Sequence, residues 1–331
     1  MDDNTDKKTP RKKPGTPLFM GAMAFYLLLV HGTSLLMTQA GTVQGPPLDC
    51  PDIWPWLTGT LNSLGGASAL SCALVALPLL YGCMVCVFLL TRQIVGGPPW
   101  LGSLAGTFLM AHPAKTEILF TPTGLFYCLA TLAALAATLA YVRLCTQGCV
   151  GRYMIALACF VCATVPFAVN AALFGVLILI EFMVGDPEKR NWLRLLPFVL
   201  VTMLANWFHL DTIYAQMPTL ATMFGPLLLV VYPIGLLPET VASLGFAPWQ
   251  AWGWGVLVFV CVVASLYYIK SKPYRFAVIA IILFRFYPGA LPIDYVTMDG
   301  GGQLFYPLAL TGVALAALSV AVAAMVSVNT I

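Results

Sequence analysis

Acidic and imidazole side chains gather in the segments between the long apolar stretches of this chain. Asp49 and Asp52 lie in a proline-rich loop, where an aspartate can act as general base on an acceptor hydroxyl. His112, Lys115 and Glu117 follow a short apolar stretch, where the imidazole and the carboxylate can bind a phosphate-linked sugar through a metal ion or serve in proton transfer. The same residue types also suit solvated turns, so both interpretations stay open at these positions.

Other polar residues with a possible role lie close to later apolar stretches. His209 and Asp211 form a similar pair after a later apolar stretch. Arg285 lies near the outer end of another, where an unpaired guanidinium costs at least ~2.5 kcal/mol. It can extend to lipid head groups or pair with an acid, and the sequence permits Glu181 or Asp294 as that acid. These residues indicate a site without identifying its reaction.

The elements that must position these groups are long and apolar. The chain is 60% hydrophobic and 9% charged, whereas about a quarter of the residues in soluble domains are charged. Several stretches approach the length that crosses a bilayer, and in lipid such stretches must be helical because nothing else satisfies their backbone groups. We predict an all-α, polytopic integral membrane protein with about 10–11 transmembrane helices. The stretches near that length are 18–37, 67–90, 125–141, 171–184, 252–268 and 308–326, and the further candidate spans are 100–110, 155–165, 195–207, 217–237 and 276–286.

The placement of charge predicts the orientation. Residues 1–17 carry five basic side chains directly before the first apolar stretch, which predicts a disordered cytoplasmic tail. Residues 186–194 are also rich in charge and are expected in the cytoplasm. Residues 18–331 then form a single transmembrane helical domain with a cytoplasmic N-terminus. The number of crossings after His209 stays open, because basic residues near position 270 conflict with simple alternation.

Most of the ten cysteines lie inside apolar stretches. Cys83 and Cys86 form a C-x-x-C pair, and so do Cys159 and Cys162. No histidine is near either pair in the sequence, and both contexts are apolar. We therefore interpret these thiols as small packing residues and predict no metal ligands among them.

Two segments carry a family resemblance. The chain reads HPAKTE at residues 112–117 and GLFYCLATLAALAATLAYVR at 124–143. The stretch 100–143 around them resembles the membrane module of the tetratricopeptide-linked transmembrane O-mannosyltransferases and their bacterial relatives. Three looser segments are similar to further parts of that family, so the resemblance covers most of the chain. They are WPWLTGTLNSLGG at 54–66, NWLRLLPFVLV at 191–201, and FYPGALP with QLFYPLAL at 286–310.

The resemblance implies the fold of the class C (GT-C) glycosyltransferases, which transfer sugar from a polyprenyl-phosphate donor at the extracytoplasmic face. It implies that Asp49 or Asp52 is the catalytic base. The expected donor-binding residues are His112, Lys115, Glu117, His209, Asp211 and Arg285. The cofactor stays open, with a divalent metal as one option for an active enzyme. The expected partners are lipids, a polyprenyl-phosphate sugar and other membrane protein subunits, with no nucleic acid.

The chain departs from the family at charged positions. Its first loop offers only Asp49 and Asp52, residues 166–173 are uncharged where the family has a Lys-Glu pair, and Gly302 or Gln303 replaces an arginine. Each lost charge-assisted contact is worth roughly 1.5–3 kcal/mol. A catalytically inactive scaffold subunit of a membrane complex is therefore an alternative. A transporter is a second alternative, disfavoured because no repeated half-structure and few intramembrane charges are evident.

Overall fold

The computed structural model describes residues 16–38, 69–111, 122–165, 172–185, 191–208, 248–286 and 312–313. Within these ranges every regular element is a helix and none is a strand, which confirms the predicted all-α class. Each predicted apolar stretch between residues 18 and 286 that falls in these ranges forms a helix. The elements are α1 (Thr16–Thr38), α3 (Ala69–Ile94), α4 (Pro99–Ala111), α6 (Pro122–Gln147), α7 (Val150–Thr164), α8 (Leu173–Met183), the short 3₁₀ helix η4 (Trp192–Leu195), α9 (Leu196–Phe208), α13 (Pro248–Tyr268) and α14 (Lys272–Phe286).

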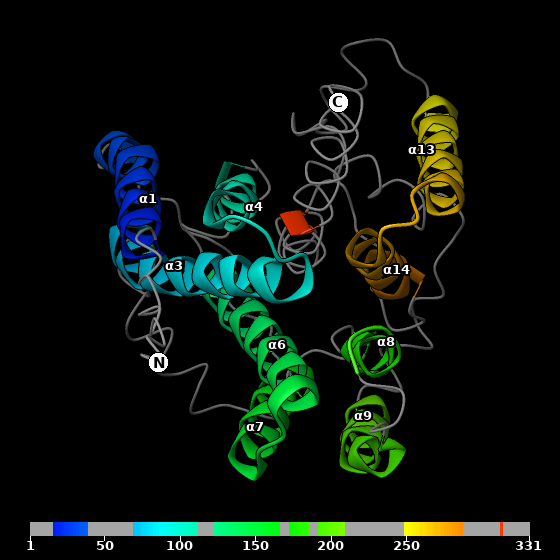
Figure 1. The fold of residues 1–331 in the computed structure, drawn as a ribbon. Helices are drawn as coiled ribbons and strands as arrows, with labels where there is room; N and C mark the ends of the chain where they lie inside the picture. Colours follow the sequence, from blue (N-terminus) through cyan, green and yellow to red (C-terminus); the bar gives the residue numbers. More distant parts are fainter. Residues whose placement is uncertain are drawn as a thin grey trace, which may run out of the picture.

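Helix α3 packs against α1, α4 and α6 (Figure 1). Its contact face is apolar, and Met84 and Phe88 on it are fully buried. The start of α1 lies beside the end of α3, because Nη1 of Arg92 donates a hydrogen bond to Oγ1 of Thr16 at 3.1 Å.

Helix α4 approaches α3 closely because glycine lies at the contact. Gly102 and Gly106 are four residues apart and therefore share one face of the helix. A Cβ atom on Gly102 would lie 2.9 Å from the carbonyl oxygen of Phe88 and 2.7 Å from its ring. Small residues of this kind let helix backbones meet closely in membrane proteins.

Helices α6 and α7 form a hairpin with a two-residue connection. Gly148 has a φ of +47°, a left-handed conformation that favours glycine at the end of a helix. Helix α9 is anchored on this hairpin by the buried ring of Phe198. The rings of Tyr141, Tyr153 and Phe160 meet it edge-on, with centroids 5.1–5.8 Å away.

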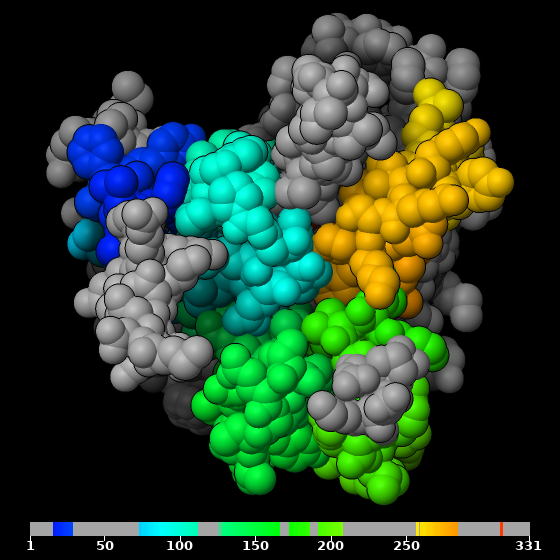
Figure 2. All heavy atoms as spheres, in the orientation of Figure 1, coloured from blue at the N-terminus to red at the C-terminus, as the bar shows by residue number. Residues whose placement is uncertain are grey.

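Helices α13 and α14 extend the bundle. The Ser265 and Tyr274 hydroxyls share a 2.6 Å hydrogen bond that joins α13 to α14. Helix α14 packs on α8, where the side chain of Leu283 lies against Gly175. In the space-filling view the side chains of α14, in orange, meet those of the green segments (Figure 2).

Two of the described helices are long and apolar enough to cross a membrane, namely residues 73–94 of α3 and 127–147 of α6. The core helix of a soluble protein can meet the same criterion, and 50% and 67% of these two segments are buried. Length and composition thus give weak support for a membrane location.

Replacing Gly102 with alanine tests the close approach of α4. We expect Gly102→Ala to lower stability by about 1–3 kcal/mol, because the new methyl group meets a backbone oxygen that cannot move aside easily. The matched control is Gly21→Ala in α1, where a Cβ would meet no atom within 4 Å. Thermal unfolding of the purified variants measures the difference. Equal melting temperatures for the two variants would contradict the packing of α4 on α3.

Candidate functional site

The predicted site residues fall largely outside the described part of the chain. Arg285 belongs to α14, one residue before its end, and its side chain is not among those described. The remaining predicted residues lie outside the described ranges, and their roles stay predictions. They are Asp49, Asp52, His112, Lys115, Glu117, His209 and Asp211.

The described helices enclose a different polar group, the carboxylate of Glu181 near the end of α8. This side chain is 1% exposed. Its Oε2 accepts hydrogen bonds from the hydroxyl of Tyr141 at 3.1 Å and the thiol of Cys145 at 3.2 Å. Its Oε1 accepts the backbone N–H of Asn191 at 3.1 Å. One carboxylate therefore joins α6, α8 and the start of η4.

Local sequence explains how these donors converge. Tyr141 and Cys145 are four residues apart on α6, so both side chains face the same neighbour. Asn191 is the N-cap of η4, and its side-chain oxygen accepts the N–H of Leu193 at 3.1 Å while its own N–H bonds Glu181. The sequence had suggested Glu181 only as a partner of Arg285. The four-residue spacing of two donors on a facing helix was the signal that could have indicated this cluster.

Arg194 contributes positive charge beside this cluster. It lies close enough to Tyr141 and Cys145 for its charge to act on both groups. A buried carboxylate needs such compensation, because desolvation otherwise makes its charged form costly. The cluster therefore combines three hydrogen-bond donors with a nearby guanidinium.

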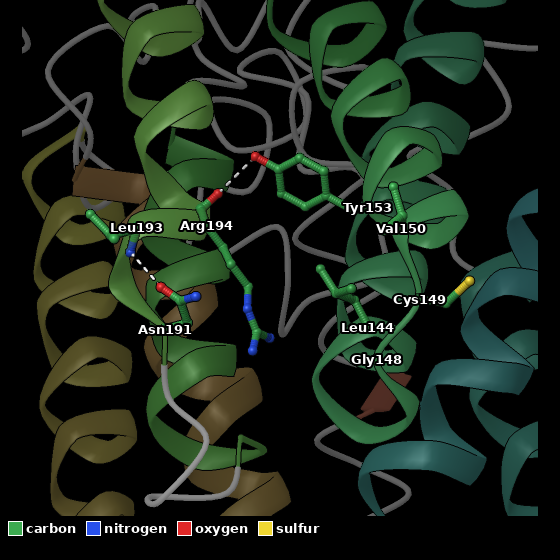
Figure 3. Close-up of a pocket in the computed structure, with 8 residues that line it drawn as sticks. All are labelled: Leu144, Gly148, Cys149, Val150, Tyr153, Asn191, Leu193 and Arg194. Carbon is green, nitrogen blue, oxygen red and sulfur yellow. Dashed lines mark hydrogen bonds between the residues drawn. The ribbon is translucent and has the colours of Figure 1, made fainter.

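A cavity of about 490 Å³ lies next to the cluster, between the α6–α7 turn and the segment that begins η4. Figure 3 shows Tyr153 on one wall, with its hydroxyl donating a 3.2 Å hydrogen bond to the carbonyl oxygen of Arg194 on the other. The guanidinium of Arg194 extends into the space between the two walls (Figure 3). The residues that line the cavity include Leu144, Val150, Tyr153, Asn191, Leu193 and Arg194.

Cys149 lies in the α6–α7 turn and is exposed, with its sulfur directed away from the cavity (Figure 3). The nearby backbone N–H groups of Gly151 and Arg152 lower the pKa of the Cys149 thiol, and the positive charge of Arg152 adds to the effect. A lowered pKa increases the thiolate fraction at neutral pH, and the thiolate is the reactive form.

The geometry of Glu181 suits a structural tie between helices. Both carboxylate oxygens already accept hydrogen bonds from protein donors, so Glu181 is poorly placed to take a proton from a substrate as a general base. Among the residues described, no three or more His, Cys, Asp or Glu side chains gather as a metal site would require. Comparisons with known protein families, curated proteins and solved structures found no match to this chain.

Removing the carboxylate tests its role as a tie. We expect Glu181→Ala to lower stability by about 1–3 kcal/mol for each buried donor left without an acceptor, whereas Glu181→Gln keeps an acceptor oxygen and should lose less. Tyr141→Phe removes one of the hydrogen-bond donors. The loss of stability that it causes should be smaller in a protein that already carries Glu181→Ala. Thermal unfolding of the four proteins and of the wild type gives the coupling. Fully additive effects of Tyr141→Phe and Glu181→Ala would exclude the hydrogen bond between them.

Proposed function

We propose that this chain is a multi-pass membrane protein with a cytoplasmic N-terminus and a class C glycosyltransferase-like fold. The observation that carries the membrane part is the amount of large apolar side-chain surface left uncovered on the described helices. Leu18, Phe25 and Leu28 on α1 are each at least 60% exposed. Exposed apolar patches larger than a few hundred Å² are rare on soluble monomers.

A second uncovered face runs along η4 and α9. Its residues recur every three or four positions, which places them on one side of the helix. All are more than half exposed: Leu193, Leu196, Leu200, Met203, Leu204 and Trp207. Burying a large apolar side chain is worth about 1.5–3 kcal/mol relative to leaving it in water. A bilayer would bury the whole of this uncovered face.

The ends of the helices support the proposed orientation. Arg92 at the end of α3 lies beside Thr16 at the start of α1. Tyr153 near the start of α7 bonds the carbonyl of Arg194, just before α9. Arg152 reaches back to the carbonyl of Arg143 near the end of α6. These basic residues occupy helix ends that alternating crossings assign to the cytoplasm.

For the reaction, we propose sugar transfer from a polyprenyl-phosphate donor at the extracytoplasmic face, with Asp49 or Asp52 as base. His112 and Glu117 would orient the donor phosphate or a metal ion. The other donor-binding residues would be Lys115, His209, Asp211 and Arg285, the last of these near the end of α14. This proposal is supported by the family resemblance of residues 100–143 and by the all-helical fold.

A scaffold subunit is the second candidate function, and a specific observation favours it. Residues 166–173 carry no charge, and the arginine expected near Gln303 is missing. The buried carboxylate that the described helices do contain, Glu181, bonds other parts of the same chain. A protein that keeps its fold while losing phosphate-binding charges would serve as a binding partner for other membrane subunits.

Membrane insertion and orientation can be tested together. We expect the protein to stay in the membrane pellet without detergent. In a variant that keeps only Cys149, a membrane-impermeant maleimide should label the thiol after permeabilisation but not in intact cells. The lowered pKa of Cys149 should make labelling efficient at neutral pH. A variant that keeps only Cys50, in the predicted first outer loop, is the control and should be labelled in intact cells. Labelling of Cys149 from outside would refute the orientation.

The two candidate functions differ in their response to loss of the outer acids. If the chain transfers sugar, the double variant Asp49→Asn, Asp52→Asn should lower the rate of transfer from a polyprenyl-phosphate sugar by at least ~100-fold, which is the lower end of what a general base contributes. Its melting temperature should stay unchanged. Asp2→Asn with Asp3→Asn in the tail is the matched control and should leave transfer unchanged. Retained transfer in the outer-loop variant would rule out these bases. Absent transfer in the wild type, with stoichiometric co-purifying subunits that persist in the variant, would support the scaffold.

A further inference from the structure

We infer that the turn between α13 and α14 docks on the anionic lipids of the cytoplasmic leaflet. Residues 269–271 form the turn, between Tyr268 at the end of α13 and Lys272 at the start of α14. The two helices lie next to each other on the right of Figure 1. The inference rests on the proposed membrane insertion and goes beyond it, because the order of the apolar stretches leaves the membrane side of this turn open.

Positive charge is concentrated at this turn. The side chains of Lys270 and Lys272 are exposed, and Arg275 lies in the first turn of α14. Nε of Arg275 donates a 3.2 Å hydrogen bond to the carbonyl oxygen of Ile269, which holds the guanidinium against the turn. Three basic groups therefore lie within six residues of one another.

No acidic side chain of the described residues offsets this charge. Residues 248–286 contain neither aspartate nor glutamate. The single acid among the described residues is Glu181, which is buried and bonded to Tyr141 and Asn191. Basic groups next to a membrane are attracted to anionic lipids, whose negative surface charge is found on the cytoplasmic leaflet. The turn has the charge that such a surface requires.

Uncovered aromatic and apolar side chains indicate a lipid surface in preference to an acidic macromolecule. Tyr267 and Tyr268 are each 79% exposed, and their rings meet edge-on with centroids 5.4 Å apart. Tyrosine favours the membrane interface, because its ring is apolar and its hydroxyl can reach the head groups. Leu257 and Val260, earlier on α13, are also about half exposed, at 49% and 55%. An apolar helix that ends in tyrosines and then lysines matches the change from hydrocarbon to charged head groups.

Hydrogen bonds hold the turn in one conformation. The hydroxyls of Ser265 and Tyr274 share the 2.6 Å bond that joins α13 to α14. The backbone N–H of Ile269 donates to the carbonyl oxygen of Ser265 at 2.8 Å, and the N–H of Arg275 donates to that of Ser271 at 3.1 Å. The backbone that carries the two lysines is therefore already ordered, which lowers the entropy cost of docking.

The side on which this turn lies has a consequence for the path of the chain. Alternating crossings through the predicted stretches 217–237 and 252–268 would place the turn outside the cell. A cytoplasmic turn instead places the start of α13 on the outer side, where the proposed orientation also places the end of α9. The second arrangement agrees with the preference of lysine and arginine for the cytoplasmic side.

The wild-type protein can report the side of the turn without any substitution. A membrane-impermeant amine reagent is applied to intact and to permeabilised cells, and the modified lysines are identified by peptide mass spectrometry. We expect Lys270 and Lys272 to be modified only after permeabilisation. Lys7 and Lys8 in the predicted cytoplasmic tail are the inner controls, and Lys115, in a predicted outer segment, is the outer control.

Modification of Lys270 and Lys272 in intact cells, with the tail lysines still protected, would overturn the inference. Modification of the tail lysines in intact cells would refute the proposed orientation instead. A protein that is soluble without detergent would refute the proposed membrane insertion before any labelling. The failure of the inference is therefore distinguishable from the failure of the proposal on which it rests.

A second experiment tests the preference for anionic lipid. The full-length protein is reconstituted in phosphatidylcholine nanodiscs that contain a small, equal fraction of photoreactive phosphatidylglycerol or photoreactive phosphatidylcholine. Mass spectrometry then compares the lipid crosslinks to the peptides around the turn. We expect phosphatidylglycerol to be favoured by roughly fivefold or more, as expected for a basic residue beside an anionic surface. Peptides from the uncovered face of α9 should show no comparable preference.

Variants of the two lysines assign this preference to the turn. The double variant Lys270→Gln, Lys272→Gln should lower the crosslinking ratio toward one with an unchanged melting temperature, because both side chains are exposed. The double variant Lys270→Arg, Lys272→Arg keeps the charge and should keep the preference. Equal crosslinking of the two lipids to the wild-type turn would overturn the choice of an anionic lipid surface. A preference that persists in the glutamine variant would overturn the role of the lysines.

Discussion

A carboxyl group can be buried in a bundle of apolar helices only when hydrogen-bond partners replace the water that it loses. Glu181 meets this constraint through Tyr141, Cys145 and the backbone of Asn191. Because its donors come from α6 and η4, the carboxylate fixes where α9 begins relative to the α6–α7 hairpin. Phe198 then packs its ring against that hairpin. The cavity beside Arg194 follows from these two contacts.

The N-terminal part of the described chain depends on shape more than on polar bonds. Gly102 brings α4 against the backbone of α3, and Gly82 lies against Leu132 of α6 in a similar close contact. In lipid, apolar surface alone gives little reason for helices to associate, so close packing and a few buried polar contacts must do so. The two kinds of contact occur in different regions. Small residues allow close packing around α3, and the buried hydrogen bonds of the Glu181 cluster join α6, α8 and η4.

The long apolar runs of the sequence predicted the helices of the described ranges, because a helix satisfies the backbone groups of such a run within the run itself. The ends were less predictable. Helix α6 extends to Gln147 and α7 begins at Val150, since only the left-handed conformation of Gly148 determines where the hairpin turns. The Glu181 cluster depends on three segments far apart in the sequence, and no local pattern specifies their contact. The predicted outer-loop acids, Asp49 and Asp52, lie outside the described residues, and their roles stay predictions.

The charge on the described helices bears on what the chain does. An outer site for a lipid-linked sugar requires charges that hold phosphate, and the chain lacks several that its resemblance would supply. The described helices instead concentrate guanidinium groups at Arg143, Arg152 and Arg194, around one turn. If these helix ends face the cytoplasm, their charge meets the anionic leaflet, where each basic residue near the surface is worth about 1 kcal/mol. In the proposed orientation, that contribution would anchor the bundle and hold the α6–α7 hairpin at a fixed depth, with or without sugar transfer by the predicted outer loops. A scaffold needs this fixed depth as much as an enzyme does, so fold and anchoring can persist after the chemistry is lost.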